Sequence, residues 1–95
     1  MTNTPLVLVH GWGMAPAHWG TFGDELAASL GAELGESFSL AVPALPGHGG
    51  APRVPDWRVD MLADEWVERW PGAVWVGWSL GGQVALAAAA RAPGR

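Results

Sequence analysis

The sequence predicts an α/β fold in which short parallel strands alternate with helices in the order βαβαβα. Three observations support this class. There are short runs rich in leucine and valine, apolar residues at helical spacing between those runs, and glycine or proline where one pattern gives way to the other. Because parallel strands need long crossover connections, the alternation favours a parallel sheet covered by helices.

The predicted elements follow one another along the chain with short connections. Residues 6–10 (LVLVH) form a short run of leucine and β-branched residues that ends at Gly11, which indicates a strand buried on both faces. The other predicted elements are a helix over 19–34 with a ragged end, a strand over 37–42, a helix over 59–70, a strand over 73–78 and an alanine-rich helix over 83–92. The segment 43–55 is rich in proline and glycine and is predicted to be a loop at the rim of the sheet.

The composition excludes several classes of function. The 95 residues include nine carboxylates, five arginines and no lysine, for a formal net charge of −4. Without lysine there is no Schiff-base or phosphate-loop chemistry, and without a basic run we expect no nucleic acid and no membrane surface as partner. The absence of cysteine removes thiolate nucleophiles and zinc–thiolate sites, so we expect no metal site. No apolar stretch approaches the roughly 20 residues of a membrane span and no leader is apparent, which predicts a cytoplasmic protein.

The sequence GWSLG at 77–81 matches G-x-S-x-G at the predicted junction of a strand and a helix. Exposing the Ser79 hydroxyl there requires so tight a bend that only small residues fit on either side, which explains Gly77 and Gly81. Gly82 is expected to let the helix start close to the sheet. Ser79 would then lie at a helix N-terminus, where free N–H groups stabilise negative charge. We therefore predict that Ser79 is a nucleophile.

The sequence HGWG at 10–13 follows the first strand directly. Acyl transfer needs two donors for the oxyanion of the tetrahedral intermediate, and a glycine-flanked loop can present a backbone N–H there. We predict the N–H groups of Trp12 and Leu80 for this role. His10 is expected to fill space between loops rather than to act as the catalytic base. A dinucleotide fingerprint is disfavoured because Pro16 stands where its third glycine would be.

Three motifs in this order resemble the N-terminal half of an α/β-hydrolase: HGWGM…W at 10–19, LPGHG at 45–49 and GWSLGG at 77–82. The tryptophans in the first and last motifs resemble more closely the BioH-type carboxylesterases, the pimeloyl-[acyl-carrier protein] methyl ester esterases of biotin synthesis. Ala44 and Ala51 stand where the family usually has an acidic residue and a serine.

The resemblance implies a carboxylesterase that hydrolyses the methyl ester of a pimeloyl chain carried on acyl carrier protein. It further implies Ser79 as nucleophile, the backbone N–H groups of Trp12 and Leu80 as oxyanion hole, and substrate contacts from all three residues. It implies neither a metal nor an organic cofactor. The alternatives are another ester hydrolase, a carbon–carbon bond hydrolase and a non-catalytic binding module.

The triad of this fold runs in the order serine, acid, histidine, yet no Asp, Glu or His follows Leu80. We therefore expect residues 1–95 to be an N-terminal fragment of a single α/β-hydrolase domain, cut before the triad acid and histidine. Such a fragment is expected to have negligible activity alone, because a serine without its base is a weak nucleophile. His48, flanked by glycines, is expected to be an exposed loop residue.

Overall fold

The computed structural model describes residues 3–54 and 57–91, and its helices and strands alternate as predicted. The strands are β1 (Thr4–Val9), β2 (Phe38–Ala41) and β3 (Val74–Gly77). The helices are the short 3-10 helix η1 (Pro16–Trp19), α1 (Phe22–Leu34), α2 (Val59–Arg69) and α3 (Leu80–Arg91). The predicted α/β class is confirmed, while the last residue of the final predicted helix, Ala92, lies outside the described residues.

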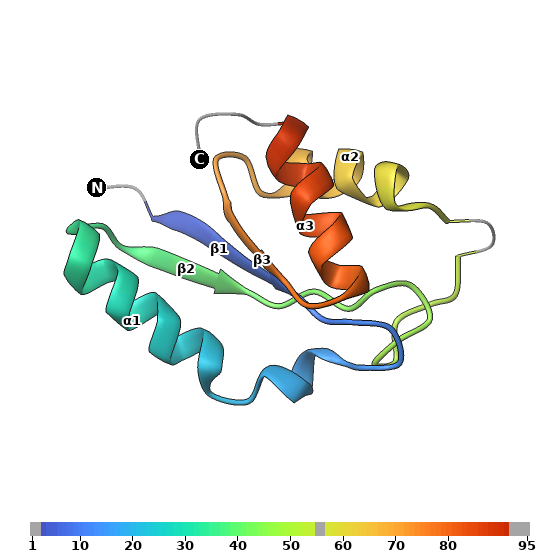
Figure 1. Ribbon diagram of the computed structural model, residues 1–95, viewed down its shortest axis with the longest axis horizontal. Helices are drawn as coiled ribbons and strands as arrows, with labels where there is room; N and C mark the ends of the chain where they lie inside the picture. Colours follow the sequence, from blue (N-terminus) through green and yellow to red (C-terminus); the bar gives the residue numbers. More distant parts are fainter. Residues whose placement is uncertain (1–2, 55–56, 92–95) are drawn as a thin grey trace.

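The central strand of the sheet is β1, which pairs in parallel with β2 on one side and β3 on the other (Figure 1). Leu6 lies opposite Leu40 of β2 and Val74 of β3. The last four residues of β1 are fully buried, which confirms the predicted burial on both faces. Because the strands run in one direction, the segments that follow them all leave the sheet at the same edge.

Helices cover both faces of this sheet. Figure 1 shows α1 on one side and α2 with α3 on the other. Successive residues of β1 point to opposite faces: Leu8 packs toward Gly23 of α1, whereas Val9 joins a core cluster with Trp66 of α2 and Val84 of α3. A Cβ at Gly23 would lie 3.2 Å from the Leu8 side chain, so glycine lets α1 pack close to the sheet.

The predicted helix over 19–34 begins only at Phe22, because Trp19 ends the separate 3-10 helix η1 and Gly20, with φ 55°, follows it. The ragged end that we expected is wrong. The helix α1 ends sharply because Gly35 adopts the left-handed conformation, with φ 66°, and donates its N–H to the Gly31 carbonyl at 2.9 Å.

The last helix begins at Leu80, three residues earlier than the alanine-rich pattern predicts. The Ser79 carbonyl accepts the N–H groups of Gly82 and Gln83 at 2.9 and 3.2 Å, so the glycines form the first turn. Propensity is a weak guide here because tertiary packing against β1 and β3 fixes the start of the helix.

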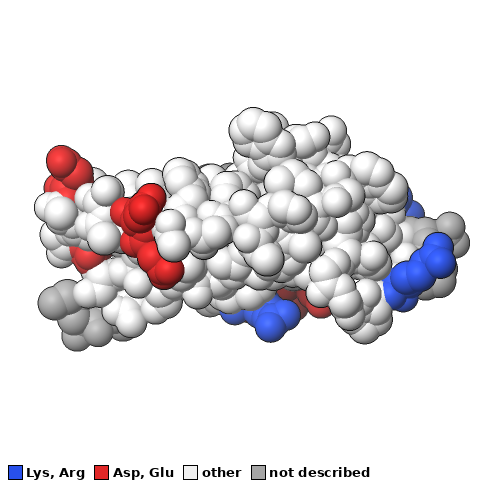
Figure 2. All heavy atoms as spheres, turned by 90° about the horizontal axis from the view of Figure 1, so that it is seen from below, with Lys and Arg blue, Asp and Glu red and all other residues white. Residues whose placement is uncertain are grey.

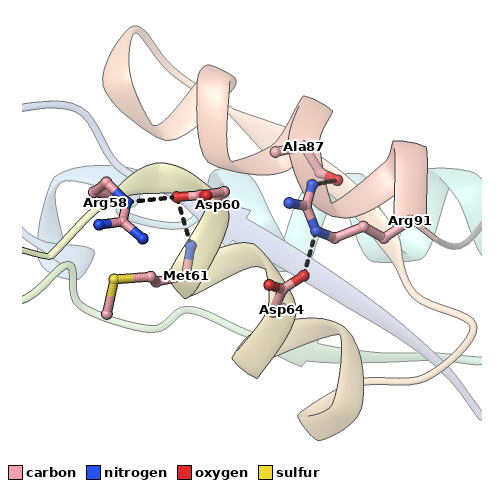
Figure 3. A network of polar contacts seen from close by, with 6 residues as sticks. All are labelled: Arg58, Asp60, Met61, Asp64, Ala87 and Arg91. Carbon is pink, nitrogen blue, oxygen red and sulfur yellow. Dashed lines mark hydrogen bonds and ion pairs between the residues drawn. The ribbon is translucent and has the colours of Figure 1, made fainter.

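Two ion pairs involve carboxylates of α2, one with the residue before the helix and one with α3 (Figure 3). Arg91 of α3 pairs with Asp64 of α2 and also donates to the Ala87 carbonyl at 2.9 Å, which joins the two helices. Arg58 pairs with Asp60 at the start of α2, at 3.3 Å. Such exposed pairs contribute about 0–1 kcal/mol each, so apolar packing holds these helices in place.

The face seen from below in Figure 2 is mostly uncharged, with most of its visible acidic side chains toward the left end and further acidic atoms beside basic ones near the lower edge. Within residues 3–54 and 57–91, no helix combines the length and the apolar character needed to cross a bilayer.

We predict opposite effects for alanine at two adjacent glycines of α3. The Cβ of Gly81→Ala would lie 2.0 Å from the Val9 carbonyl oxygen, so this variant should lose at least about 3 kcal/mol of stability. Gly82→Ala is the matched control, because its Cβ would meet the backbone only at 3.6 Å. It should gain about 0.5 kcal/mol from the better helix propensity of alanine. Urea unfolding followed by tryptophan fluorescence measures both, and equal losses would contradict the close approach at Gly81.

Candidate active site

Ser79 occupies the sharp turn between β3 and α3. Its φ of 55° makes it the sole non-glycine residue with positive φ among residues 3–54 and 57–91. The turn is anchored on β1, because Trp78 donates its N–H to the Val9 carbonyl at 3.0 Å. Ser79 itself is exposed to solvent. A strained, exposed serine in a sharp turn from a parallel strand into a helix is the geometry of a nucleophile elbow.

The glycines of the motif are needed for space. A Cβ at Gly77 would lie 2.2 Å from the Gly81 carbonyl oxygen, and one at Gly81 would lie 2.0 Å from that of Val9. The predicted close contact across the turn is therefore confirmed. The expectation for Gly82 is wrong: a Cβ there would make ordinary van der Waals contact, so the close approach of helix and sheet depends on Gly77 and Gly81.

The loop after β1 lies against this turn. A Cβ at Gly11 would lie 3.1 Å from both the carbonyl oxygen and the Cδ1 atom of Trp78. Trp12, the next residue, is 71% exposed. Within the described part of the chain, the backbone N–H groups of Trp12 and Leu80 have no hydrogen-bond acceptor. Both groups are thus available for a ligand at the carboxyl ends of the strands, where Ser79 is exposed.

His10 is fully buried and joins the loops that follow β1 and β2. Its Nδ1 atom lies 2.9 Å from the Gly11 carbonyl oxygen, which can only accept, so Nδ1 carries the proton. Its Nε2 atom accepts the Leu45 N–H at 3.0 Å. Burial is the main cause that holds the pKa of His10 below its ordinary value of 6.5. With both ring nitrogens engaged in structural bonds, His10 fills the space between loops, as expected.

The expectation that His48 is merely exposed is wrong. It is half-buried, and its ring packs edge-on against Trp12 with centroids 5.0 Å apart. Its Nε2 atom accepts the Gly13 N–H at 3.0 Å and its Nδ1 atom lies 3.0 Å from the Pro46 carbonyl oxygen. The sequence held one usable signal: His48 follows β2, and in a parallel sheet the segments after β1 and β2 meet at one edge.

Two hollows adjoin this edge. One, of about 360 Å³, lies beside the ring of Trp12 and is lined among others by His48, Arg53 and Trp57. The other, of about 620 Å³, lies between the segment 41–54 and α2. The segment 43–54 contains neither helix nor strand, as predicted for a rim loop, whereas Pro55 lies outside the described residues. Within residues 3–54 and 57–91, no group of three His, Asp or Glu side chains could hold a metal ion.

Comparisons with known proteins agree with this geometry. A model of the alpha/beta hydrolase family matches residues 6–94. Similar proteins include the pimeloyl-[acyl-carrier protein] methyl ester esterases of Methylococcus capsulatus, 42% identical over 90 residues, and of Aromatoleum aromaticum, 42% identical over 95 residues. These alignments cover 94% and 98% of this chain but only 32% and 34% of the relatives. The chain thus spans about a third of the length of the curated relatives it matches. No solved structure matches it.

Acidification should destabilise the protein through His10. The pKa of His10 is lower in the folded than in the unfolded protein, so the unfolded state binds more protons as the pH falls through 6.5. The stability that depends on the neutral ring is present above this value and is lost below it. We expect the advantage of wild type over His10→Gln in urea unfolding to narrow from about pH 8 to about pH 5. An advantage that stays constant with pH would contradict this assignment.

Proposed function

Because the chain belongs to the α/β-hydrolase family, we propose that it supplies the nucleophile and the oxyanion hole of a serine carboxylesterase. The observation that carries this proposal is Ser79, exposed in a left-handed conformation beside a loop that has a free N–H group. A turn without a chemical role would have no reason to hold a serine where glycine fits without strain.

The proposed reaction begins when Ser79 Oγ attacks the carbonyl carbon of an ester and its proton passes to a general base. The carbonyl oxygen becomes an oxyanion, which the N–H groups of Trp12 and Leu80 stabilise by hydrogen bonds. The intermediate collapses to an acyl-enzyme as the alcohol leaves with a proton. Water then releases the acid and restores Ser79. The N-terminal end of α3 adds a favourable field at the oxyanion.

The base and its acidic partner are not found after Leu80, where the order of the triad would put them, because residues 81–95 contain no Asp, Glu or His. In the proposal they come from a part of the protein beyond these 95 residues. Removing a triad histidine can lower turnover about a million-fold, so residues 1–95 alone should show negligible turnover.

The proposed substrate is the methyl ester of a pimeloyl chain on acyl carrier protein. The support is that the relatives, 42% identical over nearly the whole chain, are named as esterases of this substrate. Trp12, Ser79 and Leu80 would contact the substrate, with the exposed indole of Trp12 beside the acyl chain. A cytoplasmic location stays a prediction from the sequence.

The nucleophile can be tested with a fluorophosphonate probe on the full-length gene product. We expect a single covalent label on Ser79, found by mass spectrometry of the peptides, and complete loss of the label in Ser79→Ala. The control is Ser29→Ala, which alters an exposed serine of α1 and should label like wild type. A label on another residue, or none on a folded protein, would refute the serine-hydrolase proposal and favour a binding module.

The substrate can be tested by comparing kcat/KM for three classes of compound with the same full-length product. We expect pimeloyl methyl ester on acyl carrier protein to exceed aryl esters and β-diketones by at least about tenfold, which is about 1.4 kcal/mol of transition-state binding. A preference for aryl esters would indicate a general esterase, and a preference for β-diketones would indicate a carbon–carbon bond hydrolase.

A further inference from the structure

Two loops that are far apart in the sequence are bonded to each other beside Ser79. The first, residues 10–14, follows β1 and carries Trp12; the second, residues 45–50, follows β2. We call them the Trp12 loop and the His48 loop. Two bonds cross between them, one from each histidine: Leu45 N–H to His10 Nε2 and Gly13 N–H to His48 Nε2, both at 3.0 Å.

The two bonds differ in what they support. The His10 bond is buried and lies at the base of the Trp12 loop, where the chain leaves β1. The His48 bond lies at the exposed tip and reaches Gly13, the residue directly after Trp12. Gly13 has φ 74°, a left-handed conformation that sets the direction in which the loop turns back. The His48 bond therefore acts at the peptide unit adjoining Trp12.

His48 is itself held in one orientation. The Pro46 carbonyl can only accept, so the proton lies on Nδ1 and leaves Nε2 free to accept the Gly13 N–H. The ring also packs edge-on against Trp12 and lies 5.3 Å, between centroids, from the ring of His10. A rigid acceptor of this kind fixes the loop tip at little entropic cost.

The His48 loop also contacts the residues that directly follow the Trp12 loop. A Cβ at Gly49 would lie 2.9 Å from Pro16 Cδ and 3.3 Å from Ala15 Cβ, so the two segments are in close contact. The residues directly after the His48 loop support it as well, because Ala51 donates to the His48 carbonyl at 2.8 Å and Gly47 donates to the Pro52 carbonyl at 3.0 Å. These contacts fix the backbone of the His48 loop, so its imidazole is held in place as an acceptor for the Gly13 N–H.

From these contacts we infer that His48 is a positioning residue that holds the Trp12 N–H in the direction of the oxyanion. The inference rests on the proposed function, since it assigns a role within that oxyanion hole. His48 touches no reacting atom; it acts through Gly13 and the ring of Trp12. Because Gly13 is exposed, water can replace the lost acceptor, so the loss should affect the position of the donor more than the stability of the fold.

The test uses two matched variants of the full-length gene product. His48→Phe keeps a ring against Trp12 but removes the acceptor, whereas His48→Gln places an amide oxygen near the position of Nε2. We expect kcat for the carrier-bound methyl ester to fall about tenfold in His48→Phe, with KM changed less than about twofold, because misplacing a donor weakens transition-state binding. His48→Gln should recover kcat to within about threefold of wild type.

Two further measurements separate positioning from a general structural role. His18→Phe removes another imidazole that accepts a backbone N–H, that of Ala15 at 2.8 Å, and it should leave kcat unchanged. Amide exchange at Gly13, read by NMR, should be faster in His48→Phe and slow in His48→Gln. If His48→Phe does not fold, His48→Asn replaces it, because its shorter side chain cannot reach Gly13.

The possible outcomes are distinct. Wild-type kcat in His48→Phe, or an equal fall in both His48 variants, would overturn the positioning role and leave the proposed function intact. A wild-type protein that neither labels at Ser79 nor hydrolyses the ester would refute the proposed function, and the positioning role with it. A fall in His48→Phe alone, with recovery in His48→Gln, supports the inference.

Discussion

The arrangement of the candidate site depends on one close approach of backbone to backbone, where α3 starts against the ends of β1 and β3. A side chain at Gly81 would overlap the Val9 carbonyl, and one at Gly77 would overlap the Gly81 carbonyl. With the chain so close on both sides, Ser79 is left in the left-handed conformation, which costs an L-residue about 1–2 kcal/mol. The bond from Trp78 to β1 helps to hold this strained turn, and the serine is presented to solvent.

The same edge of the sheet shows how histidines can serve structure beside the exposed Ser79. His10 is neutral and buried, and both of its ring nitrogens are bonded to backbone groups of two loops. His48 is closer to the surface and is bonded in the same way, with the backbone groups of Pro46 and Gly13 as its partners. Neither ring has a free nitrogen for a proton from Ser79. In the proposed reaction, the general base is therefore a group other than the two histidines that shape the Trp12 loop.

The sequence predicted the alternation of strands and helices because the buried strand β1 and the apolar faces of the helices each leave a pattern among residues that are close together in the chain. It predicted less well where distant contacts decide. The alanine-rich pattern put the start of the last helix at Gln83, but packing against the sheet starts it at Leu80. The contacts of His48 were missed for the same reason, because its partner Gly13 is 35 residues away in the chain.

By itself, the sequence determined the kind of fold and the identity of the exposed serine, because G-x-S-x-G at a strand-to-helix junction has a steric meaning that needs only neighbouring residues. The tertiary structure decided which loops meet beside that serine. The order β2-β1-β3 brings the segments after β1 and β2 to one edge. There the N–H groups of Leu45 and Gly13 donate to the imidazoles of His10 and His48. Hydrogen bonds between segments far apart in a chain exist only once the sheet has set their separation, so no local pattern could specify them.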